Sequence, residues 1–281
     1  MVAPVIHESS ASWTEMGGQK MHLECAGSGP PLLMLHGLLG GSFCWRFNVP
    51  VLATRRSIYA PDLPGMGLSP ASRSTDCSMR AQAIRLKHFI EARNLDEIDI
   101  VASSWGGGLA LLLASGNKRV RSLALVAPVN PWSEFGWNRV RFCASRLGSL
   151  MVHAGLPLSR RIHGIGIKRM YGNPLRIAAG TLEGYSARLK RHGLASNLIN
   201  TLRSWQADMT ALREAIPRVQ APTLLVWGSQ DGAVDPRSAD SLMMALKNCR
   251  AKTLSGVGHL PFEEAPEVFN RLVLDFIDQP G

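Results

Sequence analysis

The sequence predicts an α/β fold in which a mostly parallel sheet is flanked by helices and interrupted by a helical insertion. Short apolar runs of strand length alternate with helical patterns, which is typical of a parallel sheet covered by helices. The 281 residues and the hydrophobic content of 46% suffice for one large domain with a full core. A long interval, 129–221, contains helical patterns of its own.

Each expected element follows from a local pattern. The first two strands should form an antiparallel hairpin around Gly17 and Gly18, because glycines suit a tight turn. The other strands are apolar runs that end at glycine, proline or polar residues. The expected strands are 13–16, 20–25, 31–36, 57–60, 98–102, 122–126, 222–227 and 251–254. Apolar residues at helical spacing predict helices over 79–93, 236–246 and 264–277.

The interval 129–221 is too long for a simple crossover between parallel strands, which needs a dozen or more residues. Within it, apolar residues recur at steps of three and four, as on an amphipathic helix. These residues are Leu194, Leu198, Leu202, Trp205, Met209, Leu212 and Ile216. We therefore expect a helical cap over 129–221, inserted into a core domain made of 1–128 and 222–281.

Composition restricts the class of protein. The first residues do not combine a basic start with a long apolar region, so no signal peptide is predicted. No apolar run reaches the roughly 18–20 residues that cross a bilayer, so no stable membrane insertion is expected. The odd number of cysteines without paired spacing indicates reduced thiols in a cytoplasmic protein, and no metal site. The cysteines are Cys25, Cys44, Cys77, Cys143 and Cys249.

The net charge of +10 is confined to the expected cap. Residues 131–220 contain 14 Lys or Arg and 4 Asp or Glu, while the rest of the chain is balanced. This excess could be a solvated surface, or it could draw an anionic or carrier-bound substrate to the site. Nucleic-acid binding is not expected, since aromatic residues are not interleaved with the basic ones. The basic residues considered are Arg139, Arg141, Arg146, Arg160, Arg161, Lys168, Arg169, Arg188, Lys190 and Arg191.

Ser104 lies between the expected strand 98–102 and an apolar helical stretch, 109–114. Small residues two positions before and after it allow a sharp, strained turn that exposes one hydroxyl. This pattern predicts a serine nucleophile. Two alternatives are a helix N-cap role for Ser104 and Ser103 as the nucleophile, although Trp105 would then occupy the second small-residue position.

A serine hydroxyl needs a base, and the base needs a carboxylate to orient it. His259 lies on a glycine-rich loop after the last expected strand, and Asp231 follows the preceding strand. Loops at the carboxyl ends of parallel strands converge on one crevice. Asp235, just before Pro236, is the alternative acid, but its position suits a cap for the next helix.

The oxyanion of the tetrahedral intermediate needs hydrogen-bond donors. We expect the backbone N–H groups of Trp105 and Leu38 to supply them. His36 and Gly37, in the same loop as Leu38, are the candidate substrate-binding residues. His36 could also be a second base, but a structural role that braces this loop is the preferred interpretation.

Five segments together make the chain resemble the α/β-hydrolase superfamily from about residue 20 to 277. They are the His36-Gly37 loop, the segment 62–69, the turn around Ser104, the segment Trp227–Asp231 and the Gly258-His259 loop. The resemblance implies an eight-stranded, mostly parallel sheet, a lid after the sixth strand and no cofactor. The family's turn usually opens with Gly, where this chain has Ala102, so slight extra strain is expected.

The predicted function is hydrolysis of carboxylic esters, in which Ser104 forms an acyl-enzyme, His259 transfers protons and Asp231 orients His259. The expected partner is a small-molecule ester. Alternatives with the same three residues are cleavage of carbon–carbon bonds in ring-cleavage products, acyl transfer and thioester hydrolysis. A proline iminopeptidase would have to bind a cationic substrate against a basic cap. A nucleophilic Asp, as in haloalkane dehalogenases and epoxide hydrolases, is excluded by Ser104, and a non-catalytic binding protein is the alternative of another class.

Overall fold

The computed structural model describes residues 10–72, 74–155, 160–189 and 193–280. Residues 1–9, where no signal peptide is predicted, lie outside these ranges, as do Lys190 and Arg191 of the basic cap. The side chains of Arg160 and Arg161 are also outside the described part.

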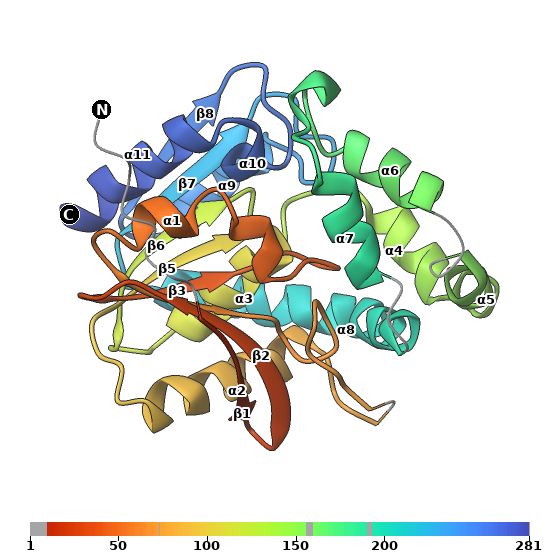
Figure 1. The fold of residues 1–281 in the computed structure, drawn as a ribbon, viewed down its shortest axis with the longest axis horizontal. Helices are drawn as coiled ribbons and strands as arrows, with labels where there is room; N and C mark the ends of the chain where they lie inside the picture. Colours follow the sequence, from red (N-terminus) through yellow and green to blue (C-terminus); the bar gives the residue numbers. More distant parts are fainter. Residues whose placement is uncertain (1–9, 73, 156–159, 190–192, 281) are drawn as a thin grey trace.

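An eight-stranded sheet forms the centre of the molecule, with the strand order β1-β2-β4-β3-β5-β6-β7-β8 (Figure 1). Strands β1 and β2 form the predicted antiparallel hairpin, β2 pairs antiparallel with β4, and the six strands β3 to β8 are parallel to one another. The strands are β1 Ser10–Met16, β2 Gln19–Ala26, β3 Pro31–Leu35, β4 Ser57–Pro61, β5 Ile98–Ser103, β6 Val120–Val126, β7 Thr223–Gly228 and β8 Cys249–Leu254. The predicted fold class is therefore confirmed.

The burial of each strand explains its sequence. β5 and β7 lie inside the sheet and are buried along their whole length, as continuous apolar runs in parallel sheets usually are. β1 lies at one edge and is mostly exposed, so it tolerates polar residues. Helices cover the sheet: α3 packs against β5 and β6, and α11 packs against β6. The core helices are α1 Val49–Leu52, α2 Met79–Ala92, α3 Trp105–Ala114, α9 Ser238–Ala245, α10 Pro261–Glu264 and α11 Pro266–Asp278, with the short 3₁₀ helix η1 Ser42–Trp45.

The chain between β6 and β7 holds a group of helices that lies to the right of the sheet in Figure 1. These are α4 Trp137–Ala144, α5 Arg146–Gly155, α6 Arg160–Lys168, α7 Thr181–Leu189 and α8 Leu194–Ala215, with 3₁₀ helices η2 Pro174–Arg176 and η3 Ile216–Arg218. We call this group the cap. The predicted apolar stripe lies on α8 and continues to Ile216, and all its members are buried except the partly exposed Trp205. No described helix is both long and apolar enough to cross a bilayer.

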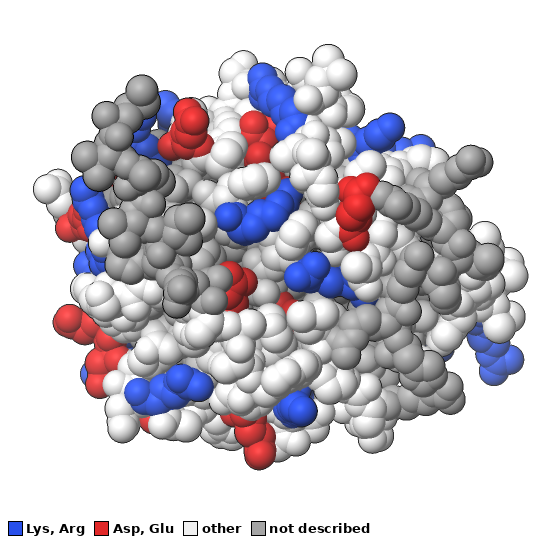
Figure 2. Space-filling model, viewed as in Figure 1, with Lys and Arg blue, Asp and Glu red and all other residues white. Residues whose placement is uncertain are grey.

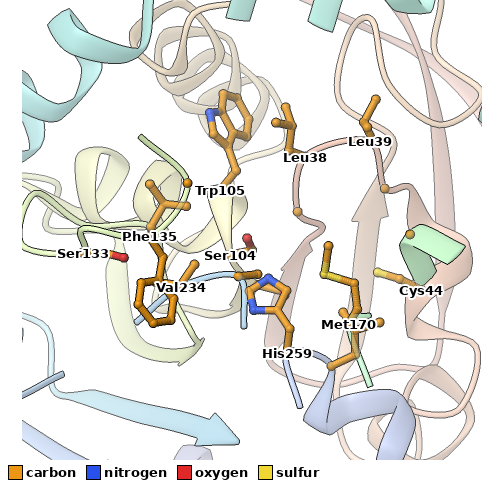
Figure 3. Close-up of a pocket in the computed structure, with 18 of the residues that line it drawn as sticks. Leu38, Leu39, Cys44, Ser104, Trp105, Ser133, Phe135, Met170, Val234 and His259 are labelled. Carbon is orange, nitrogen blue, oxygen red and sulfur yellow. The ribbon is translucent and has the colours of Figure 1, made fainter. Parts of the chain in front are cut away.

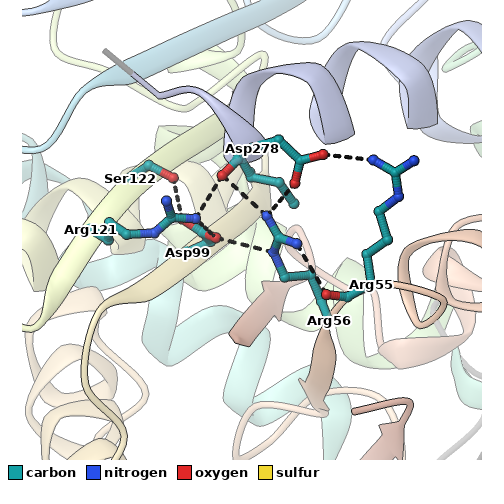
Figure 4. A network of polar contacts seen from close by, with 7 residues as sticks. Arg55, Arg56, Asp99, Arg121, Ser122 and Asp278 are labelled. Atoms are coloured by element: carbon teal, nitrogen blue, oxygen red, sulfur yellow. Dashed lines mark hydrogen bonds and ion pairs between the residues drawn. The ribbon is translucent and has the colours of Figure 1, made fainter. Parts of the chain in front are cut away.

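A buried polar network joins the amino-terminal ends of the parallel strands to the last helix (Figure 4). Asp99 of β5 is fully buried and accepts hydrogen bonds from Ser122 of β6 at 2.5 Å and from Arg121. Arg56, just before β4, lies 3.4 Å from Asp99 and 2.7 Å from Asp278 of α11. A buried carboxylate is tolerated when its charge is paired in this way. The network lies at the opposite end of the strands from the loops that follow β5 and β7.

Candidate active site

The turn at Ser104 has the strained geometry that the sequence predicts. Ser104 connects β5 directly to α3, and its backbone φ is 54°, in the region that L-residues rarely adopt. Its amide donates to the Val126 carbonyl oxygen at 2.8 Å, and its carbonyl oxygen accepts from Val129 at 2.9 Å. The side chain makes no capping hydrogen bond to α3. The alternative role of Ser104 as a helix N-cap is thus not supported.

Small residues around Ser104 are required by close backbone contacts. A Cβ on Gly106 would overlap the His36 carbonyl oxygen, and one on Gly107 would lie 2.7 Å from Pro128 Cβ. Ala102, where the resembling family usually has Gly, lies within β5 and pairs with Leu35 and Leu125 of the adjacent strands. The sharp turn therefore forms with alanine at that position.

His259 is held by Asp231, as predicted. Nδ1 of His259 donates to Oδ2 of Asp231 at 2.8 Å, and both side chains are buried. The second carboxylate oxygen of Asp231 accepts the amides of Ala233 at 2.7 Å and Val234 at 3.1 Å. These bonds place the proton of neutral His259 on Nδ1 and leave Nε2 as the basic nitrogen.

Asp235 has a different role. Its carboxylate binds the guanidinium of Arg237 at 2.7 Å, and this hydrogen bond lowers the pKa of Asp235. Its carbonyl oxygen accepts the Ser238 hydroxyl at the start of α9. Asp235 thus acts at the helix terminus, as its sequence position suggests, while Asp231 contacts His259.

Ser104 and His259 both line a cavity of about 460 Å³ between the sheet and the cap. Figure 3 shows both side chains at the centre of its lining, with Trp105 and Leu38 on one side and Phe135 and Val234 on the other. From the cap come Trp137 and Val140 of α4, His163 and Ile167 of α6, Met170, Tyr185 of α7, and Trp205 and Met209 of α8. No Lys, Arg, Asp or Glu is found among the described residues of this lining.

The predicted oxyanion loop forms a tight turn beside Ser104. Gly40 donates to the Gly37 carbonyl oxygen at 3.0 Å, and Leu39 has a φ of 61°. The amide of Leu38, at the second position of such a turn, does not take part in the turn's own hydrogen bond. Gly37, Leu38 and Trp105 all line the cavity. Their placement beside Ser104 is consistent with the predicted donors, Leu38 and Trp105.

The structure does not support the predicted contact of His36 with substrate, since His36 is not among the residues that line the cavity. It is fully buried, its Nδ1 donates to the Gly37 carbonyl oxygen at 2.8 Å, and its Nε2 accepts the Leu63 amide at 3.0 Å. Burial lowers the pKa of His36, despite the opposing effect of Asp62, so the ring stays neutral. With both nitrogens occupied, His36 braces the oxyanion loop, while Gly37 lines the cavity.

Asp62 adds a second brace that sequence analysis recognised only as part of a motif. Its carboxylate accepts the amides of Ser42 and of Leu68, the latter at 2.7 Å, and lies 3.2 Å from His22 Nδ1. Burial raises the pKa of Asp62, but these hydrogen bonds outweigh burial and leave the pKa below its usual value. The segment 62–69 thereby fixes the chain on both sides of the oxyanion turn.

None of the charged cap residues whose side chains the structure describes lines the cavity. Arg188, for example, lies over the Phe43 ring at 4.5 Å and donates to the Gly184 carbonyl oxygen at 2.9 Å. On the face shown in Figure 2, lysine and arginine side chains are separated by uncharged and acidic ones. The described lining of the cavity therefore gives no support to a cationic subsite for an anionic substrate.

Two neighbouring acidic residues that sequence analysis missed hold the cap against the His259 loop. Glu264 accepts the amides of Gly258 at 2.8 Å, Gly172 at 2.9 Å and Asn173 at 2.8 Å. The amide of His259 itself donates to the Met170 carbonyl oxygen at 2.6 Å. A buried carboxylate with three amide donors is a strong local constraint. Glu264 therefore ties the base loop to the cap segment 170–173.

Glu263 continues this connection. Its carboxylate lies 2.8 Å from Arg46 and accepts the hydroxyls of Tyr171 at 2.7 Å and of Tyr185. Burial and the nearby Glu263 charge raise the pKa of both tyrosines, which remain donors. Two consecutive acids in an otherwise apolar segment just after a candidate catalytic histidine were the available sequence signal for these residues.

Replacing Glu264 by alanine is expected to lower kcat by about 100-fold, because small misplacements of a catalytic group can cost that much. Glu264→Gln keeps an oxygen acceptor and should recover most of this loss. The measurement is kcat and KM with a soluble ester, on variants whose folding is verified by circular dichroism. Glu267→Ala, at an exposed position on α11, is the control. A folded Glu264→Ala variant with unchanged kcat would contradict a positioning role.

Other reactive groups near the site are accounted for. Cys44 lines the cavity, but burial raises the pKa of its thiol well above the usual value, so it stays a neutral, apolar surface. All five cysteines are free thiols. Within the described ranges, no group of three His, Cys, Asp or Glu side chains is arranged to hold a metal ion.

Comparisons with known proteins agree with this architecture. The model of the alpha/beta hydrolase family matches residues 32–272. The human monoacylglycerol lipase ABHD6 is 26% identical over 262 residues, which cover 89% of this chain and 76% of that protein. The 30 kDa subunit of magnesium chelatase from Rhodobacter capsulatus is 25% identical, with 89% and 87% covered.

Among solved structures, a putative lipase from Acinetobacter baumannii superposes with a TM-score of 0.84 at 26% identity, covering 97% of this chain and 93% of that one. The matched residues include the turn at Ser104, Asp231 and His259, and they run from β3 into α11. This chain belongs to the alpha/beta hydrolase family.

Proposed function

We propose that the protein is a serine hydrolase of uncharged carboxylic esters with an apolar acyl group. The observation that carries this proposal is the buried His259–Asp231 hydrogen bond beside the strained turn at Ser104, with Ser104 and His259 on one cavity. The proposal adds one contact to this geometry, from the Ser104 hydroxyl to Nε2 of His259.

The reaction follows from these positions. His259 accepts the proton as Ser104 Oγ attacks the ester carbonyl carbon, and Asp231 stabilises the resulting imidazolium. The amides of Leu38 and Trp105 stabilise the oxyanion. The tetrahedral intermediate collapses to an acyl-enzyme while His259 protonates the leaving alcohol. His259 then removes a proton from water, which hydrolyses the acyl-enzyme and restores Ser104.

The lining of the cavity supports an uncharged substrate. Aromatic and aliphatic side chains from α4, α6 and α8 surround the space next to Ser104, and the described lining has no Lys, Arg, Asp or Glu. Burying a carboxylate there without a cationic partner would be costly. This argues against the anionic products of ring cleavage. The described lining also has no acidic side chain, which argues likewise against substrates with a free amino terminus.

The names of relatives agree with this choice, since the human protein is a monoacylglycerol lipase and the bacterial structure a putative lipase. The relative named as a magnesium-chelatase subunit is the reason to test catalysis directly. A fluorophosphonate probe distinguishes a serine hydrolase from a non-catalytic protein of the same fold, because only an activated serine reacts with it.

The substrate class is tested with a panel of p-nitrophenyl esters of equal acyl length, one neutral and one with a terminal carboxylate. We expect kcat/KM for the neutral ester to exceed that for the anionic ester by about 100-fold, because an unpaired charge would be buried in the cavity. The difference should persist in high salt, since screening acts weakly on buried charges. Failure of fluorophosphonate to label Ser104 would refute the function, and preference for the anionic ester would refute the substrate class.

A further inference from the structure

Helix α5 of the cap turns its large apolar side chains outward. Leu147, Leu150 and Met151, at spacings of three and four, are 63%, 69% and 57% exposed. The opposite side of the helix approaches α4 through Gly148, where an added Cβ would overlap the Phe142 carbonyl oxygen. An amphipathic helix in a globular protein normally buries its apolar face. In α5, Gly148 faces the protein, and the large apolar side chains face solvent.

The same corner of the cap carries basic residues. Phe142 at the end of α4 is 47% exposed, and Arg139, Arg141 and Arg146 around it are exposed as well. Between Glu134 and Glu183 the sequence has eight Lys or Arg and no acidic residue. Figure 1 shows α5 at the outer edge of the cap, far from the sheet. We call Phe142, Leu147, Leu150 and Met151 with these three arginines the cap corner.

Exposed apolar side chains that form a contiguous group on one element indicate an interaction surface. An apolar helix face flanked by arginines fits an anionic lipid surface, where apolar groups enter the acyl boundary and arginines bind phosphates. A second copy of this chain fits less well, because it would bring two surfaces of the same positive sign together. We infer that the cap corner binds peripherally to membranes that contain anionic lipids.

The position of the cap corner relates it to the cavity. α4 contributes Trp137 and Val140 to the cavity lining and presents Phe142 and the arginines to solvent. Phe135, just before α4, lines the cavity and is 40% exposed. Binding through the cap corner would therefore place α4, which separates the cavity from the surface, next to the lipid.

The test is co-sedimentation of the full chain with vesicles of phosphatidylcholine alone or with one third phosphatidylglycerol. We use the Ser104→Ala background, so that the result does not depend on the proposed hydrolysis. The chain with an unchanged cap should bind the anionic vesicles at least tenfold more tightly than the phosphatidylcholine vesicles, and this preference should weaken with salt.

Two variants test the two halves of the surface. Leu147→Ser/Leu150→Ser/Met151→Ser should lose binding by about tenfold or more, and Arg139→Gln/Arg141→Gln/Arg146→Gln should remove the preference for anionic vesicles. The matched controls are Ile84→Ser/Met244→Ser/Val268→Ser and Lys118→Gln/Lys247→Gln/Lys252→Gln, at exposed positions of the core domain. When these two variants and two controls are made in the chain that retains Ser104, all of them should hydrolyse a soluble ester as the unmodified chain does.

Absence of binding to anionic vesicles, or equal loss in the control variants, would overturn the inference. If the chain instead forms dimers that the Leu147/Leu150/Met151 variant abolishes, the cap corner is an interface between copies, and the lipid assignment is wrong. Binding without activity would leave this inference intact while refuting the proposed function, so the two can be distinguished.

Discussion

Replacing Ser104 by alanine is expected to lower kcat/KM for a neutral p-nitrophenyl ester by roughly 10⁴- to 10⁶-fold, the range found when the nucleophile of a triad is removed. The reason is that Ser104 is the residue in the strained turn beside His259, whereas the Cys44 thiol of the same lining is kept protonated by burial. KM should change little, because the apolar lining that binds the acyl group is not altered. The fold should be retained, since only the hydroxyl is lost.

Ser103 provides a matched control for this experiment. It is the neighbouring serine, it lies at the end of β5, and it also lines the cavity. Ser103→Ala should retain activity within about tenfold of the original chain, because the strained turn and its exposed hydroxyl belong to Ser104. If Ser103→Ala is the inactive variant and Ser104→Ala is not, the nucleophile has been assigned to the wrong residue.

The Asp231→Asn variant should lose about 10⁴-fold in kcat, as expected when the acid of a triad can no longer hold the correct tautomer. The amides of Ala233 and Val234 donate to one carboxylate oxygen, so the asparagine would keep its oxygen there and turn its NH₂ group toward His259. Nδ1 would then have to accept, and the proton would move to Nε2. A protonated Nε2 cannot remove the proton of Ser104.

The control for Asp231 is Asp235→Asn, four residues further along the same loop. Asp235 binds Arg237 rather than His259, so its neutralisation should reduce activity by only a few-fold. The ¹H NMR resonance of the His259 Nδ1 proton, expected far downfield in the original chain, should disappear or shift in Asp231→Asn only. An active Asp231→Asn variant, or an inactive but folded Asp235→Asn variant, would show that Asp235 is the acid.

The elements and their order were predictable from local patterns. Strands such as β7, buried throughout, read as continuous apolar runs, and α8 carries its apolar residues at regular spacing. Boundaries were less accurate. In place of the single helix expected over 264–277, the structure has a short helix α10, which ends at Glu264, and α11, which begins at Pro266. The second starts at Pro266, where proline has no amide to continue the first helix.

Asp99 shows a limit of this approach. In the sequence it interrupts an apolar run, and nothing nearby indicates its partners. The structure pairs it with Arg121 and Ser122 of the adjacent strand β6 and with Arg56, just before β4, and Arg56 in turn binds Asp278 near the end of the chain. A buried charge is compensated by residues 22 to 43 positions away, so its role cannot be inferred from local spacing.

The sequence by itself determined where the candidate nucleophile and its expected partners lie, because Ser104, Asp231 and His259 each follow the end of a strand that local patterns reveal. Only the tertiary structure decided the chemistry around them. It buries His36 as a brace, keeps the described lining of the cavity free of Lys, Arg, Asp and Glu despite the basic cap, and joins the His259 loop to the cap through Glu264. Each of these depends on which distant side chains meet and how far water is excluded, and such contacts are set by packing between elements rather than by the pattern within any one of them.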